Sequence, residues 1–156
     1  EKKYEEKWLN MMRDKLGLFG TDEKDKFLIL DLLTWMHQKK VDYTNTFCHL
    51  MNEKIKEDKN YEDEDFQNWK KRWNERLKTN NNTPEKYLKL MKSVNPLIIP
   101  RNHKVEEALE TAEKGDFNSV NQLIEILKEP YSQQKNILNY QIPSDFNENY
   151  QTFCGT

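Results

Sequence analysis

Glycine, cysteine and long apolar runs are all scarce in this chain of 156 residues. Its four glycines never fall in a phosphate-binding spacing such as GxGxxG, so the sequence predicts no nucleotide-binding loop. The two cysteines, Cys48 and Cys154, are far apart and form no CxxC pair, which suits a reducing compartment better than secretion. No apolar run approaches the ~20 residues of a membrane span, and the start does not resemble a signal peptide. We therefore expect a cytoplasmic protein without membrane contacts.

An excess of either charge is also missing. The chain has 25 basic and 27 acidic residues, well mixed, for a net charge of -2. A protein that binds nucleic acid or an anionic membrane usually shows a basic patch, and none stands out in the sequence. Hydrophobic residues make up 35% and charged residues 33%, so we expect a thin core. Aromatic residues reach 12% and recur at helical spacing, which favours a folded domain over a disordered chain.

Apolar residues that recur every three or four positions predict an all-α fold, an irregular bundle of about six or seven helices. Segment 27–33 is apolar on nearly every side and is predicted to be the central buried helix. Further along the chain, one predicted helix has its apolar residues at i, i+3, i+7 and i+11. These residues are Phe66, Trp69, Trp73 and Leu77.

Local signals predict where several helices begin. Asp42 precedes one apolar stripe, and Thr83 precedes a proline at the first helical position, so both are predicted to be N-caps. Segment 95–100 cannot be helical throughout, because a residue before proline is pushed towards extended geometry. Asn102 is predicted to cap the helix that follows.

The second half of the chain is predicted to contain an αα-hairpin near 102–128, with its two helices joined at Gly115 and Asp116. Residues 1–130 are interpreted as one helical domain. Residues 131–156 are rich in Asn, Gln, Ser and Pro and are interpreted as an irregular, extended tail. The second helix of the hairpin is predicted to face inward through Phe117, Val120, Ile124 and Leu127.

The three histidines show no metal-site spacing. His37, His49 and His103 lie on different predicted elements, and none has a second histidine or a cysteine three or four positions away. His49 follows Cys48 directly, but adjacent helical residues point about 100° apart. This favours a cysteine at the edge of the core beside a half-exposed histidine. We predict no catalytic, cofactor-binding or metal-binding residue in this chain.

Two places remain as candidate sites. Arg101, Asn102 and His103 bring a cation, a cap and an imidazole to a helix start, where positive charge opposes the helix dipole and needs a partner elsewhere. We interpret these three residues as a structural anchor. Cys154 stands third from the end, where a thiol is accessible. From the residues alone, a reactive thiol and an inert exposed cysteine both remain open.

The same segments resemble the selenoprotein O family. The ending 150–156, which reads YQTFCGT, is similar to the terminus of bacterial members that contain cysteine. Weaker similarity upstream covers 12–18, 42–47 and 69–77, so the match runs over nearly the whole chain. The C-terminal signature of the family matches 95–108, which read NPLIIPRNHKVEEA, and then Gly115, Asp116, Phe117, Leu123, Leu127, Pro130 and Tyr131.

The resemblance implies an activity that lies outside these residues. Members are much longer, have a protein-kinase-like fold that binds ATP and metal in a flipped orientation, and transfer AMP to protein hydroxyls. Their catalytic residues precede the part seen here, so ATP and Mg2+ (or Mn2+) are implied only for the intact protein. Cys154 takes the place of the selenocysteine of eukaryotic members. By resemblance it forms a redox-sensitive disulfide with the kinase-like domain, whereas Cys48 has no implied role.

We therefore expect the C-terminal helical region of a bacterial protein adenylyltransferase, inactive by itself. It would support the kinase-like domain and present the redox-responsive Cys154. Its partners would be that domain and the protein substrates that accept AMP on Ser, Thr or Tyr. The opening residues are already in helical rhythm without a Met or a cap, so we expect the natural N-terminus upstream. The alternative is a free-standing helical module that binds another protein through exposed aromatic residues.

Overall fold

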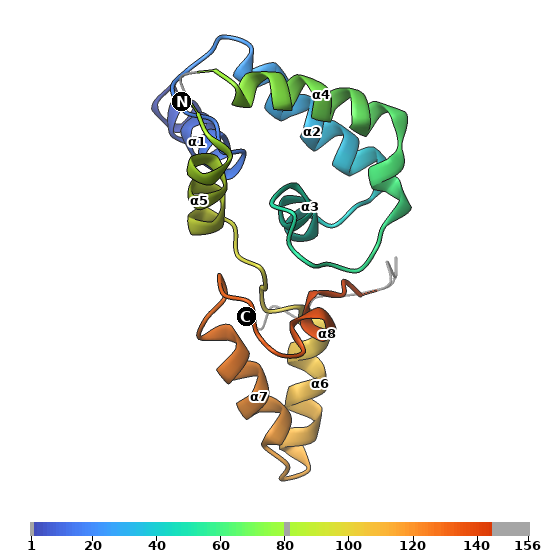
Figure 1. Cartoon of the computed structure of the whole chain (residues 1–156). Coiled ribbons are helices and arrows are strands. Elements are labelled where there is room, and N and C mark those ends of the chain that lie inside the picture. The colour runs from blue at the N-terminus through green and yellow to red at the C-terminus, as the bar shows by residue number, and fades with distance from the viewer. Residues whose placement is uncertain (1, 80–81, 145–156) are drawn as a thin grey trace.

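A computed structural model describes residues 2–79 and 82–144, and this part of the chain contains helices and no strand (Figure 1). The all-α prediction is confirmed, with eight α-helices among the described residues. The helices are α1 (Lys2–Lys15), α2 (Asp25–Lys39), α3 (Tyr43–Leu50), the 3-10 helix η1 (Lys59–Glu62), α4 (Glu64–Leu77), α5 (Pro84–Val94), α6 (Asn102–Glu113), α7 (Asn118–Leu127) and α8 (Ile137–Gln141).

Helix α8 lies inside the segment that the sequence predicts to be an irregular tail. Ile137 and Gln141 stand one helical turn apart and are 4% and 2% exposed, so this turn is fixed by burial against other parts of the chain. None of the helices in the described residues has the length and apolar content that crossing a bilayer requires.

Two of the three predicted N-caps are confirmed. The Asp42 carboxylate accepts a hydrogen bond from the backbone N–H of Asn45 at 2.8 Å. The Thr83 hydroxyl accepts one from the backbone N–H of Lys86, with proline at the start of α5. The prediction for Asn102 is wrong. Arg101 is extended, at φ -82° and ψ 129°, and occupies the cap position, so Asn102 is already the first residue of α6.

The core of the α1–α5 group is built on aromatic residues of α4. Phe66, Trp69, Trp73 and Leu77 are all buried, which confirms the predicted stripe. The indole N–H of Trp69 donates to the Leu28 carbonyl at 2.8 Å, and that of Trp73 donates to the Leu16 carbonyl at 2.9 Å. These bonds satisfy the two buried indole donors and fix α4 against α2 and the end of α1.

Helix α2 is less buried than its sequence predicts. Leu28, Ile29 and Leu32 face the core, but Phe27 is 67% exposed and Leu30 is 40% exposed. A helix in a thin bundle has neighbours on one side only, so an all-round apolar sequence leaves part of its surface uncovered.

A buried carboxylate joins three helices. Asp25 is fully buried, and its oxygens accept hydrogen bonds from Nε of Arg13 of α1 and Nε of Arg76 of α4, each at 2.7 Å. Burial acts to raise the pKa of Asp25, but the bonds from Arg76, Arg13 and the Asp22 backbone outweigh it, and the pKa is lowered. The carboxylate therefore stays charged between two cations.

The predicted hairpin forms, and it extends away from the α1–α5 group together with α8 (Figure 1). Segment 95–100 leads to it and is non-helical, as predicted. The backbone N–H groups of Leu97 and Ile98 donate to the Pro130 carbonyl at 2.7 and 3.3 Å, which ties this segment to the end of α7.

The predicted inward face of α7 is confirmed for Leu127, which packs against the core, and is wrong for Phe117 and Ile124. Phe117 is 59% exposed and Ile124 is 50% exposed, whereas Ile126 is buried. Leu123 and Leu127 pack against the core from the same side as Ile126. Apolar residues occupy more than one side of α7, and helical spacing alone does not say which side meets the rest of the protein.

Candidate functional site

Three residues are predicted to form an anchor, and Arg101 is the one whose side chain bonds to other helices. Its guanidinium forms a two-pronged ion pair with Asp42, with Nη2 2.9 Å from Oδ1 and Nη1 bonded to Oδ2. The Arg101 and Asp42 side chains are 11% and 17% exposed. Nη2 also donates to the Gln141 carbonyl at 3.1 Å. Asp42 is the N-cap of α3, so one arginine connects the starts of α3 and α6 with the end of α8.

The structure does not bring Asn102 and His103 to the same partner. Asn102 is exposed on the first turn of α6, and within the described residues its side chain makes no hydrogen bond. His103 is half-buried and lies near Glu107, whose pKa is lowered first by its hydrogen bond with Lys104 and to a smaller extent by His103. The geometry of an anchor therefore belongs to Arg101, and an anchoring role for the other two stays a prediction.

Gln141 is a polar centre that sequence reasoning missed. It is 2% exposed, and its side-chain amide donates to the Leu97 carbonyl at 2.7 Å. The backbone carbonyl of Gln141 accepts hydrogen bonds from the side-chain amide of Asn45, at 3.1 Å, and from the Arg101 guanidinium. These partners lie 40 to 96 positions away in the sequence, so no local pattern could have pointed to them.

Cys48 and His49 face different surroundings. Cys48 is fully buried, and burial, with Glu53 and Asp42 nearby, raises the pKa of its thiol to about 12. The His49 ring is half-buried and stacks on Tyr61 with centroids 4.0 Å apart. Burial and then Lys70 lower the pKa of His49 to about 4. At neutral pH the pair is a neutral thiol and a neutral imidazole, which is not the state of an activated cysteine.

Cys154 lies outside the described residues, so its predicted redox role stays a prediction. In residues 2–79 and 82–144, no three His, Cys, Asp or Glu side chains come together in a way that could hold a metal ion.

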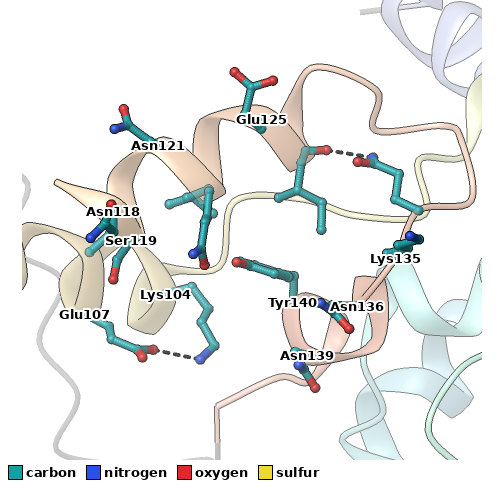
Figure 2. A pocket seen from close by; sticks show the side chains of 15 residues that line it. Lys104, Glu107, Asn118, Ser119, Asn121, Glu125, Lys135, Asn136, Asn139 and Tyr140 are labelled. Atoms are coloured by element: carbon teal, nitrogen blue, oxygen red, sulfur yellow. Dashed lines mark hydrogen bonds and ion pairs between the residues drawn. The ribbon is translucent and has the colours of Figure 1, made fainter.

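A groove of about 780 Å³ is bounded by α6, α7 and the segment that contains α8 (Figure 2). Figure 2 shows Tyr140 reaching from α8 towards α7, with the ion pair between Lys104 and Glu107 along the α6 side. Apolar lining is limited to Ala108, Leu123, Ile126 and Tyr140. The carboxamide side chains in its wall belong to Asn118, Asn121, Gln122, Gln134, Asn136 and Asn139. We call this surface the carboxamide groove.

Comparison with known proteins gives one consistent result. Residues 1–128 match the family model described as "Protein adenylyltransferase SelO". A relative from Pelagibacter ubique, called "Protein nucleotidyltransferase YdiU", is 54% identical over 157 positions. Relatives with the same description are 45% identical in Clostridium perfringens (strain 13 / Type A) and 43% identical in Nitrosococcus oceani.

Each match covers nearly all of this chain but a smaller share of the relative. The shares of the chain are 100%, 99% and 98%, and the shares of the three relatives are 32%, 32% and 31%. The chain thus spans about a third of the length of the curated relatives it matches.

Proposed function

Since this chain belongs to the protein adenylyltransferase SelO family, we propose that it is the C-terminal helical region of an enzyme that transfers AMP from ATP to Ser, Thr or Tyr hydroxyls of proteins. The support is the match over residues 1–128 together with the relatives, which are about three times as long as this chain. In this proposal a kinase-like domain outside these residues binds ATP and Mg2+ or Mn2+. The enzyme works in the bacterial cytoplasm.

The role of the region itself is to support that catalytic domain. The observation that carries this proposal is the apolar side of the hairpin. Leu109, Phe117 and Ile124 are 56%, 59% and 50% exposed. Phe117 and Ile124 stand seven positions apart, so they lie on the same side of α7, and neither of them lines the carboxamide groove. We call these three residues the outer face of the hairpin.

In this proposal the exposed side chains of Leu109, Phe117 and Ile124 form a contact surface for another polypeptide. The relatives contain about twice as much additional chain as the part matched here, which supplies a polypeptide to cover the outer face. The catalytic domain of the same protein is therefore our proposed partner for this face.

The outer face can be tested in the intact protein. Phe117→Ser together with Ile124→Ser should lower the unfolding temperature of the catalytic domain and its rate of AMP transfer, since an interface within the chain is lost. Phe27→Ser is the matched control, because Phe27 is 67% exposed on α2, far from the hairpin. If the double variant and the control behave alike, the outer face is not the supporting surface.

The activity is tested separately with the intact protein and ATP labelled at the α-phosphate. We expect label on protein hydroxyls from the α-phosphate and none from the γ-phosphate. Label transferred from the γ-phosphate would indicate a kinase and contradict the proposal. The chain alone should give no saturable heat of ATP binding in a calorimetric titration, because its four glycines form no phosphate-binding loop.

A redox role for Cys154 is the second part of the proposal. The chain has two cysteines, and Cys48 is fully buried with a pKa raised to about 12, so it is unsuited to exchange with a terminal thiol. By the family resemblance, the disulfide partner of Cys154 would come from the kinase-like domain.

The outer face also fits the alternative of a free-standing module that binds a different protein. Separate expression of this chain and of the preceding part of the natural protein discriminates the two ideas. Association in solution supports the catalytic partner. A chain that stays monomeric beside the preceding part favours the module.

A further inference from the structure

The carboxamide groove contains polar side chains that the fold does not use. Asn118 and Gln122 of α7 and Asn136 and Asn139 near α8 line it, and within the described residues none of the four side chains makes a hydrogen bond. Gln134 differs, because its amide N–H group donates to the Ile126 and Glu129 carbonyls at 2.8 Å and closes the end of α7. The other amides hold no part of the protein in place.

A carboxamide carries one acceptor oxygen and an NH2 donor on the same planar group. A peptide bond carries the same pair of groups, so a carboxamide can donate to the carbonyl and accept from the N–H of an extended main chain. Apolar small molecules fit the groove poorly, because their sites are lined mostly by hydrophobic side chains. Nucleic acid needs a positive groove, whereas Lys104 and Lys135 are balanced here by Glu107 and Glu125.

The spacing along α7 also fits an extended chain. Asn118 and Gln122 are four positions apart, which places them about 6 Å apart along the helix axis. Alternate residues of an extended chain repeat at roughly 6.6 to 6.8 Å. Two successive carboxamides can therefore meet two equivalent peptide groups on the same edge of a bound strand. Asn136 and Asn139 belong to the opposite wall of the groove, next to Tyr140.

We propose that the carboxamide groove binds an extended, uncharged stretch of main chain in a protein substrate, through Asn118, Gln122 and Asn139. This proposal rests on the proposed function and names where that enzyme holds its substrate away from the reacting hydroxyl. Because recognition is by main-chain groups, the groove accepts many sequences, and Tyr140 covers one side chain of the bound segment.

Fluorescence anisotropy of a fluorescein-labelled Ser/Thr/Gln/Ala peptide of about ten residues tests the proposal on the intact protein. Asn118→Ala, Gln122→Ala and Asn139→Ala should each weaken peptide binding roughly two- to tenfold, the effect of one lost hydrogen bond. Asn136 is left unchanged because its φ of 62° makes alanine strained there. Asn74→Ala, an exposed asparagine on α4, is the matched control and should bind as the unaltered protein does.

A peptide of the same sequence that is N-methylated at alternate residues is the second probe. It keeps the side chains and removes main-chain donors, so it should bind at least about fivefold more weakly. Equal binding of both peptides, or the same affinity in the three groove variants as in the Asn74 control, overturns the proposal. Binding of maltohexaose with no binding of the peptide assigns the groove to carbohydrate and also overturns it. Since the readout is binding, failure of AMP transfer would leave this result unaffected.

Discussion

The Arg101 guanidinium holds the Asp42 carboxylate across 59 positions of sequence, with Nη2 2.9 Å from Oδ1. The same carboxylate caps α3 through the backbone N–H of Asn45. Two helix starts, which both favour negative charge, therefore share one aspartate, and the arginine offsets its charge. The positive charge of Arg101, unfavourable at the start of α6 by itself, is explained by this partner.

Replacing Arg101 with alanine should destabilise the protein by about 3 kcal/mol, because Asp42 is left nearly buried without its cation. Arg101→Lys should lose less, since it keeps the charge but not the two-pronged geometry. Urea unfolding of the intact protein measures both. Activity should fall only as far as unfolding explains. A large loss of activity at an unchanged unfolding midpoint would show that Arg101 has a catalytic role and is not an anchor.

Asp25→Asn should be more costly than a comparable surface change, by about 3 to 5 kcal/mol, because two nearly buried arginines lose their common carboxylate. Asp31→Asn is the control, since Asp31 and Arg72 are 49% and 53% exposed and such a pair contributes at most about 1 kcal/mol. The lowered pKa of Asp25 means that its stabilisation is present above the ordinary carboxyl pKa and is lost as the pH falls further. Unfolding midpoints at neutral pH measure the loss of stability in Asp25→Asn and in Asp31→Asn, and equal losses would contradict the buried role of Asp25.

Two glycines at positive φ should respond differently to alanine. Gly17 has φ +69°, and a Cβ there would lie 2.9 Å from the Tyr87 Cβ and 3.1 Å from Met91. Gly115 has φ +85° with nothing within 4 Å of the added atom. Gly115→Ala should cost about 1 to 2 kcal/mol of backbone strain. Gly17→Ala should cost roughly 1 to 3 kcal/mol more from crowding. Thermal unfolding that shows equal losses would contradict the packing of α5 on the end of α1.

His49 should make the protein less stable as the solution becomes acidic. Its pKa is about 4 in the folded protein, mainly because of burial and then Lys70, and about 6.5 in an unfolded chain. Protons therefore bind the unfolded chain more tightly, so stability is complete above pH ~6.5 and decreases as the pH falls towards 4. His49→Phe keeps the stacking on Tyr61 and should reduce this decrease. A His49→Phe variant that keeps the full decrease at acidic pH would exclude His49 as the cause.

Cys154→Ser should abolish any response of AMP transfer to reductant in the intact protein, if the terminal cysteine forms the proposed disulfide. Cys48 should stay unlabelled by a thiol reagent in the native state, because it is fully buried. The test measures AMP transfer with and without dithiothreitol in the unaltered protein and in the Cys154→Ser variant. A serine variant that keeps the response of the unaltered protein would show that the redox switch lies elsewhere.

Local sequence determined the helices and several of their ends. The spacing of Phe66, Trp69, Trp73 and Leu77 follows the period of an α-helix, so it fixes one buried side without reference to the rest of the chain. Capping depends on a side chain within three residues of the helix start, which is why Asp42 and Thr83 could be identified. The prediction that Asn102 is an N-cap is wrong because Arg101, with its extended backbone, takes the cap position. Helix α6 therefore begins at Asn102, one residue earlier than predicted.

Tertiary structure alone decided which apolar surfaces are covered and which polar groups meet. Helical spacing gives the angle between two side chains on α7, but the choice of Ile126 over Phe117 and Ile124 depends on where α8 and segment 95–100 pack. Gln141 gains its partners at Leu97, Asn45 and Arg101 only when the chain folds back over them. The carboxamide groove has the same origin. A polar row on α7 becomes one wall of a groove because the segment that contains α8 forms the other wall. The helical spacing of residues along α7 cannot predict that contact.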